Sequence, residues 1–289
     1  MVLLVGLGTG CGARDDKAAA DPPGCPAKIT RTESMDVSWA PRSSRLAFST
    51  VEKGIFVVDA ETCVVKQVTR ARLHFTPDWS PDERQLVFDR TVVPGSRSDL
   101  LITDLKGGDA RVLTHGSDDR FPSWSPRGDL IAFTRGADIY VIQPDGRGLR
   151  RLTNTGYNVQ PDCSPDGTAI AWACDSGICT MDADGSHARR LFEPSTGGEF
   201  GNPAWSPDGR SIAFDGPVSY DPPVLMIGPA QGGRIRMLPR LAPGALWDVA
   251  PTWSPDGDDI AFVGDHGSRH ELYIVRLDGS DVRALTESS

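Results

Sequence analysis

The sequence has 289 residues, a formal net charge of −9 at pH 7 and charged residues at 24% of its positions. Without a long apolar span, this composition is typical of a soluble globular protein. The acidic balance disfavours binding to bulk nucleic acid, because affinity for phosphate backbones comes from clustered Lys and Arg and the basic residues here are scattered through strand ends.

The chain begins with a short apolar stretch, residues 1–10, that ends in small residues directly before Cys11. This resembles the end of a bacterial lipoprotein signal, whose cysteine is acylated and becomes the mature N-terminus. Gly8 stands where Leu is usual, and the positively charged start of a signal peptide is missing. The stretch predicts a signal-peptide remnant over 1–10, lipidation at Cys11 and an exported protein held at the outer face of a membrane in the bacterial envelope. The alternative is a disordered N-terminus with an incidental cysteine.

Residues 11–27 are expected to form a flexible tether, because the segment is rich in Ala, Asp, Pro and Gly and has nothing to bury. From residue 28 onward the chain is organised by a repeat, of which residues 203–214 are the cleanest copy. Ser206–Gly209 has the Pro, Asp and Gly of a tight turn. Trp205 precedes the turn as a large apolar anchor, and Ile212 and Phe214 follow it with the period of two that strands show.

Six copies of this repeat follow one another. Their anchor positions are Trp39, Trp79, Trp124, Cys163, Trp205 and Trp253, separated by 40, 45, 39, 42 and 48 residues. A period near forty residues with several short strands per unit is typical of β-propeller blades. The sequence therefore predicts an all-β fold, a six-bladed β-propeller of four-stranded antiparallel blades, in a single domain over residues 28–289.

The Trp-Ser-Pro-Asp-Gly, Ile-Ala-Phe and Asp-Gly…Arg-Leu-Thr elements resemble the propeller repeats of the TolB family, roughly over residues 34–286. The same repeat type occurs in propellers of prolyl-oligopeptidase-like peptidases and other secreted proteins. TolB carries an α/β domain before its propeller, and the roughly thirty residues before the first blade are too few for one. A peptidase would need a hydrolase domain, and none follows the sixth repeat.

The cysteines other than Cys11 suit two disulfides and one free thiol in an exported protein. Cys174 and Cys179 flank a hairpin loop, so we expect a bond between them. A second bond between Cys25 and Cys63 would staple the N-terminal arm to the first blade. Cys163 replaces an anchor Trp and is expected to be a buried, inert thiol. The alternative is that all five are unpaired in a reducing compartment.

Two local patterns resemble metal sites. Residues 182–193 place carboxylates at offsets like those of an EF-hand, but His187 occupies the position that requires Gly, so we interpret the segment as a turn. His266 and His270 have the spacing of a helical zinc pair, but Gly267 and Ser268 lie between them in a hairpin loop. We therefore predict no metal site and no cofactor, and the sequence has no nucleophile with an evident base.

The loops predict where binding takes place. One propeller face has uniform turns, whereas the other has long irregular connections, and variable loops on a rigid scaffold commonly carry binding. The innermost strands begin on this irregular face, at positions that hold Glu33, His74, Asp118, Asp119, Tyr157, Glu199 and Asp248. Since innermost strands converge on the axis, we expect an acidic ring that binds a basic or amine-bearing partner segment. The alternative is that each carboxylate accepts hydrogen bonds from loop amides.

Two function classes remain open. The favoured class is a non-catalytic binding scaffold, a monomer attached to the membrane only by lipid, that presents a propeller face to a protein or ligand. The resemblance supports it, because in the TolB family this channel mouth is a docking place for extended peptides of partner proteins. The other class is a metal-dependent hydrolase or lyase with its site in the channel, which would need converging His and carboxylate side chains.

Overall fold

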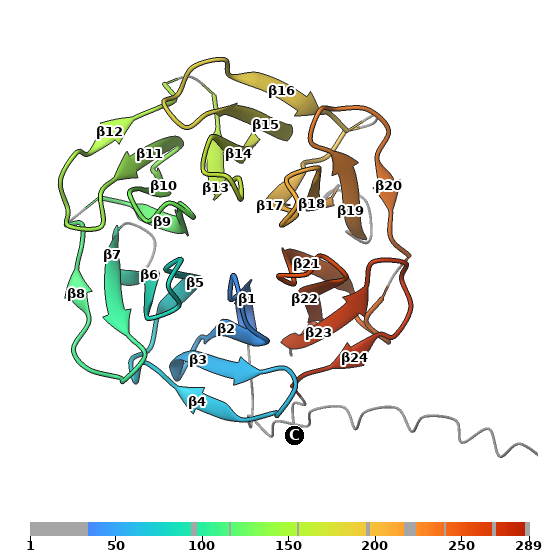
Figure 1. Cartoon of the computed structure of the whole chain (residues 1–289), viewed down its shortest axis with the longest axis horizontal. Helices are drawn as coiled ribbons and strands as arrows, with labels where there is room; N and C mark the ends of the chain where they lie inside the picture. Colours follow the sequence, from blue (N-terminus) through green and yellow to red (C-terminus); the bar gives the residue numbers. More distant parts are fainter. Residues whose placement is uncertain are drawn as a thin grey trace, which may run out of the picture.

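The computed structural model describes residues 34–93, 97–115, 117–154, 156–194, 197–216, 224–239, 241–267 and 270–286. These residues form six antiparallel sheets of four strands each, arranged as blades around a central channel (Figure 1). The predicted all-β, six-bladed propeller is confirmed. Each blade is built from consecutive strands, with the first strand at the channel and the fourth at the outer rim. Glu33, Cys11 and Cys25 lie outside the described residues.

The first three blades cover the N-terminal half of the propeller. Blade 1 contains β1 (Ser34–Trp39), β2 (Arg45–Thr50), β3 (Gly54–Asp59) and β4 (Val65–Gln67). Blade 2 contains β5 (His74–Trp79), β6 (Gln85–Val93), β7 (Arg97–Asp104) and β8 (Arg111–Val112). Blade 3 contains β9 (Asp119–Trp124), β10 (Ile131–Arg135), β11 (Asp138–Ile142) and β12 (Arg150–Arg151).

The other three blades follow in the same order. Blade 4 contains β13 (Asn158–Cys163), β14 (Ala169–Cys174), β15 (Gly177–Asp182) and β16 (Arg189–Phe192). Blade 5 contains β17 (Gly201–Trp205), β18 (Ser211–Gly216), β19 (Val224–Pro229) and β20 (Arg236–Met237). Blade 6 contains β21 (Trp247–Trp253), β22 (Asp259–Asp265), β23 (His270–Arg276) and β24 (Arg283–Ala284).

The repeated Ser-Pro-Asp-Gly segment forms the turn between the first and second strands. In blade 5, Gly209 has φ +69° and donates its N–H to the Ser206 carbonyl at 2.9 Å. The Asp208 carboxylate accepts from the Ser206 hydroxyl at 2.6 Å and the Arg210 N–H at 3.0 Å. The Ser206 hydroxyl in turn accepts from the Ser211 N–H at 2.9 Å. The turn thus satisfies its own backbone groups, which explains why the motif recurs.

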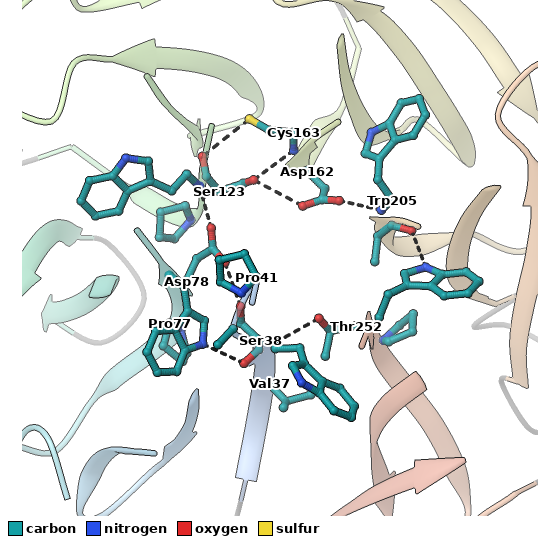
Figure 2. A pocket seen from close by; sticks show the side chains of 18 of the residues that line it. Val37, Ser38, Pro41, Pro77, Asp78, Ser123, Asp162, Cys163, Trp205 and Thr252 are labelled. Carbon is teal, nitrogen blue, oxygen red and sulfur yellow. Dashed lines mark hydrogen bonds between the residues drawn. The ribbon is translucent and has the colours of Figure 1, made fainter. Parts of the chain in front are cut away.

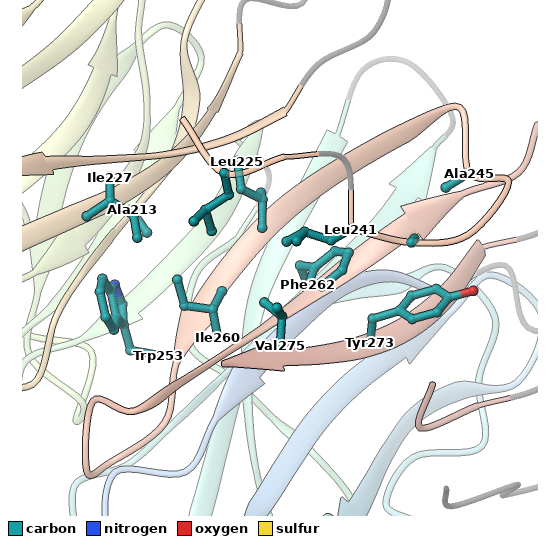
Figure 3. Packing of buried hydrophobic residues seen from close by; sticks show 12 residues of the cluster. Ala213, Leu225, Ile227, Leu241, Ala245, Trp253, Ile260, Phe262, Tyr273 and Val275 are labelled. Atoms are coloured by element: carbon teal, nitrogen blue, oxygen red, sulfur yellow. The ribbon is translucent and has the colours of Figure 1, made fainter. Parts of the chain in front are cut away.

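The hydrophobic core is divided among the interfaces between neighbouring blades. Between blades 5 and 6, Trp253 packs with Ile227 of β19 and with Ile260 and Val275 of blade 6 (Figure 3). Comparable clusters join the other blades, and the Phe at the centre of the second strand is fully buried in five blades. Because both faces of a sheet are covered, the strands have nearly continuous apolar runs.

Each innermost strand contains a bulge that the sequence analysis did not foresee. In blades 2 to 6 the residue before a proline has a positive φ, between 44° and 55°: Thr76, Phe121, Gln160, Asn202 and Ala250. The pairing with the second strand shifts at the same place in every blade. A bulge bends the strand and redirects its backbone groups, here toward the neighbouring blade.

The two ends of the described chain meet where the ring closes. Blade 6 receives its outermost strand, β24, from the C-terminal segment, and β1 is the innermost strand of blade 1. Blades 1 and 6 are joined by side-chain packing, in which Leu285 and Ile274 share a cluster with Phe48. The segment Lys28-Ile29-Thr30, also expected to form an outer strand, lies outside the described residues. No helix among the described residues has the length and apolar character to cross a membrane.

Cys174 and Cys179 form a disulfide across the β14–β15 hairpin, with a Cα–Cα distance of 5.8 Å. Both cysteines are buried. Cys63 is also disulfide-bonded. Its predicted partner, Cys25, lies outside the described residues. Cys163 is a free thiol.

The anchor residues provide the first test of the architecture. Trp79 is 3% exposed, and its indole N–H donates to the Ser38 carbonyl of blade 1 at 3.1 Å. We expect Trp79→Ala to lower the free energy of unfolding by roughly 3–5 kcal/mol, because it leaves a cavity between two blades. Val64→Ala is the matched control, since Val64 is 65% exposed and its truncation should cost less than about 0.5 kcal/mol. Urea denaturation of both variants checks this, and equal midpoints would contradict the anchor role.

Candidate binding site in the central channel

A cavity of about 600 Å³ occupies the centre of the propeller. All six innermost strands line it, together with the prolines of the first turns, so it extends to the face with uniform turns (Figure 2). The prolines of these turns are Pro41, Pro81, Pro126, Pro165, Pro207 and Pro255. Ligand pockets of small molecules commonly have volumes of about 300–1,000 Å³. The channel is therefore large enough to admit a side chain or a short extended segment.

The residue before each anchor joins its blade to the next one. In blade 1 the Ser38 hydroxyl donates to Asp78 at 2.8 Å. The other carboxylate oxygen of Asp78 accepts the backbone N–H of Trp124 in blade 3 at 2.6 Å. Ser123, in turn, accepts the N–H of Cys163 at 3.0 Å and lies 3.3 Å from Asp162. Figure 2 shows these bonds around the channel wall.

The remaining three interfaces complete the ring. Asp162 accepts the N–H of Trp205 in blade 5 at 2.7 Å. The indole N–H of Trp253 donates to the Ala204 carbonyl at 3.1 Å, which joins blades 5 and 6. The Thr252 hydroxyl accepts the N–H of Trp39 at 3.2 Å, which joins blade 6 to blade 1. Every interface between blades is thus crossed by a hydrogen bond at the level of the anchors, and we call this set of bonds the anchor ring.

A second set of bonds crosses the blades at the bulges. At each of these bulges, a side chain of one blade accepts the backbone N–H of the bulge residue in the next blade. The pairs are Asp36 with Thr76, Asp89 with Phe121, Thr134 with Gln160, Gln160 with Asn202, and Asp215 with Ala250. Asp89 also accepts the Thr76 hydroxyl. The positive φ of each bulge residue turns its N–H toward the preceding blade, and this accounts for the conserved geometry of the inner strands within this chain.

Three carboxylates reach the cavity: Asp36, Asp78 and Asp162. They are half-buried, surrounded by protein but open to the channel. Burial raises the pKa of Asp36 to about 7, and the charge of Asp89 adds to the shift. Burial also raises the pKa of Asp162 to about 7, with a smaller contribution from the charge of Asp78. The pKa of Asp78 is raised by burial as well, against its hydrogen bonds with Trp124 and Ser38.

Cys163 stands in the channel wall at the position of an anchor tryptophan. Its thiol donates weakly to the Ser123 carbonyl at 3.7 Å. This bond corresponds to the one that the Trp79 indole makes to the Ser38 carbonyl. Burial raises the pKa of this thiol to about 12, and Asp162 adds to the shift. Since the thiolate is the reactive form, Cys163 is inert near neutral pH.

Two of the carboxylates expected in an acidic ring at the irregular mouth are buried. Asp248 is 1% exposed and accepts the backbone N–H groups of Leu241 and Ala242 at 2.8 and 3.3 Å. Asp119 is fully buried and pairs with Arg135 at 2.6 and 2.9 Å. Two of the carboxylates thus stabilise loops or strands, because a buried ionised group needs its own partners.

His74 is another predicted site residue that the fold buries. Its Nδ1 lies 3.1 Å from the Thr69 hydroxyl, and its ring packs against Phe88 with centroids 4.8 Å apart. Burial lowers the pKa of His74 to about 4, and the charge of Arg90 contributes to the shift. The imidazole is therefore neutral near pH 7 and belongs to the packing of blade 2.

The remaining predicted residues do reach the surface. Tyr157 is 53% exposed, Glu199 is exposed, and Asp118 is half-buried with Arg120 at 2.7 Å. Trp247, next to Asp248, is 43% exposed. None of these side chains lines the central cavity. Their part in binding stays a prediction. The mouth has exposed aromatic rings, of Tyr157 and Trp247, as well as carboxylates.

The two metal-like patterns can now be placed. His270 lies 3.2 Å from Asp265, and His266 lies 3.7 Å from Glu271 and 3.2 Å from the Tyr273 hydroxyl. The two histidines thus form separate carboxylate pairs. Asp182 pairs with His187 at 2.7 Å at the turn between β15 and β16. In the part of the chain that the structure describes, no group of three or more His, Cys, Asp or Glu side chains is placed to hold a metal ion.

The sequence analysis did not identify the residues that line the channel, although the sequence contains a signal for them. The residue before the anchor is polar in five repeats: Ser38, Asp78, Ser123, Asp162 and Thr252. A polar residue that recurs beside a buried anchor indicates a conserved hydrogen bond within the repeat. The bulge that aims Asp36 into the channel leaves no pattern that periodicity alone would reveal.

Comparisons with known proteins agree on the fold. The family model for the dipeptidyl peptidase IV N-terminal region matches residues 80–166. TolB from Acinetobacter baumannii is similar with a TM-score of 0.66 and 23% identity, over 92% of this chain and 68% of that one. TolB from Agrobacterium tumefaciens has a TM-score of 0.68 and 20% identity, over 88% and 90%. A manganese complex of oligogalacturonate lyase has a TM-score of 0.57 and 18% identity, over 86% and 77%. No curated protein matches the sequence significantly.

The raised pKa values predict how stability depends on pH. Asp36 and Asp162 have pKa values of about 7 in the fold, against an ordinary value of 3.8. The folded state therefore binds these protons more tightly than the unfolded state does. The stability that the two groups contribute is fully present below pH 3.8 and is lost as the pH rises through 7. Replacing both by Asn should flatten the decline of stability between about pH 4 and 7, by on the order of 1 kcal/mol per carboxylate.

Urea denaturation at several pH values measures this slope. Asp258→Asn is the control, since Asp258 is exposed on the uniform face. We expect the control to follow the parent and the double variant to diverge from it. A double variant whose stability declines with pH as steeply as that of the parent would show that these carboxylates do not titrate near neutrality.

Proposed function

We propose that this chain, a TolB-like six-bladed propeller, is a non-catalytic protein of the bacterial cell envelope that binds a basic or amine-bearing partner segment in its central channel. The likeness to two TolB structures supports the envelope location and the binding role. The size and lining of the channel support the type of ligand. The cavity contains the carboxylates of Asp36, Asp78 and Asp162, and Arg42 at its rim is the one basic residue among the described residues that line it.

One observation carries the proposal: the anchor ring does not require carboxylates. Neutral groups close it at the other interfaces, where Ser123, Thr252 and the Ala204 carbonyl accept the bonds. Hydrogen bonds offset only part of the cost of ionising a carboxylate in this partly desolvated channel, since burial still raises the pKa of Asp78 and Asp162. Asp78 and Asp162 are therefore retained for a purpose beyond closing the ring, and a cationic ligand would stabilise their ionised form.

The exposed side chains of the irregular mouth extend this site in the proposal. Glu199 supplies negative charge and Tyr157 supplies an aromatic surface around the end of the channel from which the innermost strands begin. Asp118 lies at the same end, half-buried and paired with Arg120. A focused field of one sign attracts a partner of opposite charge. The buried His74, Asp119 and Asp248 hold this mouth in shape.

Binding of a cationic peptide tests the channel. The probe is a hexapeptide that contains Lys and Arg, with a Glu-containing hexapeptide as its counterpart, measured by calorimetry. We expect the basic peptide to bind to the parent protein. The double variant Asp78→Asn/Asp162→Asn should bind it at least about tenfold more weakly, because two charges close to the ligand are lost. Affinity should increase from about pH 5.5 to 8, because Asp36 and Asp162 ionise in that range.

Two comparisons make this experiment decisive. Glu61→Gln should bind as the parent does, since Glu61 is exposed and lies outside the channel. Equal binding of the acidic and basic peptides would contradict the proposal. So would a divalent ion held tightly and in stoichiometric amount by the purified protein, since that would favour the metal-dependent hydrolase or lyase class, to which the fold similarity with oligogalacturonate lyase also points.

Membrane attachment through Cys11 is part of the same proposal, because it would hold the propeller at the envelope surface by the tether of residues 11–27. In the native bacterium, Cys11→Ala should lose membrane association and appear in the soluble fraction, while the parent partitions into the detergent phase. Immunoblots of a detergent phase separation measure this. If both forms enter the aqueous phase equally, the chain is not lipidated at Cys11.

A further inference from the structure

A second cavity, of about 320 Å³, lies between blades 4 and 5 on the face with uniform turns. Its walls come from the first turn of blade 4, from β15 and the turn after it, and from the last turn of blade 5, while Trp205 separates it from the central channel. We call it the blade 4–5 groove. It is distinct from the site proposed above, because Asp36, Asp78 and Asp162 do not line it.

An internal comparison shows which side chain would cover the groove. In blade 1 the first residue of the second strand is Arg45, whose guanidinium lies 5.0 Å from the centre of the Trp79 ring and pairs with Glu83. The corresponding residue in blade 4 is Ala169. Ala169 is too short to cover Trp205, so the space that Arg45 fills at the blade 1–2 interface is open here.

Two features coincide only at Trp205 among the anchors. It is half-buried, as Trp39 is, whereas Trp79, Trp124 and Trp253 are 3%, 7% and 8% exposed. Its indole N–H lies inside the protein without a hydrogen-bond acceptor among the described residues, as that of Trp124 does, whereas that of Trp253 donates to a carbonyl at 3.1 Å. The groove therefore has a partly open aromatic wall that no indole hydrogen bond holds in place.

The rim of the groove is polar and nearly balanced in charge. Asp182 and His187 pair at 2.7 Å, and the hydrogen bond with Asp182, together with its charge, raises the pKa of His187. Arg189 is exposed and lines the same groove. So do the hydroxyls and carboxylate of the blade 4 turn, where hydrogen bonds from Ser164 and Thr168 lower the pKa of Asp166. The lining thus combines two carboxylates with a guanidinium and an imidazole, which favours a neutral ligand over a strongly cationic or anionic one.

We propose that the blade 4–5 groove binds a neutral sugar ring, with one face of the ring against Trp205 and its hydroxyls bonded to Asp182, His187 and Arg189. The electron-rich face of an indole attracts the weakly positive C–H groups on a sugar face. A hydroxyl both donates and accepts, so it suits a rim that mixes carboxylate, imidazole and guanidinium. The volume, at the low end of the range for ligand pockets, fits one ring better than a chain of several.

The decisive variant is Ala169→Arg, which places in blade 4 the side chain that covers the anchor in blade 1. It should fill the groove without unfolding the chain, because Ala169 lies opposite Asp182 in the β14–β15 register and the new guanidinium would have a carboxylate partner. Ser211→Arg makes the same change at the corresponding position of blade 5, next to the already buried Trp253. Thermal unfolding of both variants reports whether they are folded.

Saturation-transfer NMR on the full chain measures binding of glucose, N-acetylglucosamine, glucuronate and the N-acetylglucosamine tetrasaccharide. We expect a neutral monosaccharide to bind, Ala169→Arg to weaken it at least tenfold, Arg189→Ala to weaken it several-fold and Ser211→Arg to leave it unchanged. A tetrasaccharide that binds at least as tightly as the monosaccharide indicates a glycan as the source, and one that is excluded indicates a free sugar.

Three results would overturn the proposal: no binding of any neutral sugar, binding that Ala169→Arg does not change, or a preference for glucuronate. These results are independent of the channel. Binding of the basic hexapeptide should be the same in Ala169→Arg as in the parent, so the groove and the channel can fail separately.

Discussion

The propeller depends on the anchor ring, the hydrogen bonds that cross all six blade interfaces beside the channel. Sheets packed face to face are held mainly by non-directional apolar contact, which fixes their separation better than their register. The anchor ring adds direction, since the N–H of Trp124 must meet Asp78 and the N–H of Trp205 must meet Asp162. A six-membered ring closes only if every blade turns by the same amount, and one bond of fixed geometry per interface enforces that condition.

The repeat solves one structural problem with different side chains. Where the residue before the anchor is Ser38 or Ala204, its carbonyl accepts the next indole N–H. Where that residue is Asp78 or Asp162, its carboxylate accepts the next backbone N–H instead, and the indole N–H groups of Trp124 and Trp205 have no partner among the described residues. The bond is therefore preserved at each interface while the group that makes it varies, which allows individual blades to acquire other chemistry.

The sequence predicts the blades well because their signals are local. The turn of Ser206–Gly209 and the period of two after it arise within a dozen residues, and six copies in phase leave few alternatives. The site is harder to predict because it depends on contacts that only the folded chain makes, some of them between residues about forty positions apart. Asp248 was expected at an open mouth, yet two amides of the loop before β21, at 2.8 and 3.3 Å, occupy its carboxylate. Whether an Asp faces solvent, an amide or an arginine is decided by how the surrounding loops and strands fold, and composition and spacing contain no information on that choice.

The channel carboxylates show that stability and binding make opposite demands on the same residues. Near neutral pH, burial favours the protonated form of Asp162, so ionising it weakens the fold. A serine at this position would close the ring without that cost, as Ser123 does one blade earlier. The cost is removed when a cation enters the channel, because it stabilises the ionised form in the same low-dielectric surroundings that made ionisation unfavourable. A carboxylate whose ionisation weakens the fold is thus the group that would gain most from a cationic ligand, and this difference is the physical basis for the proposal that the channel binds one.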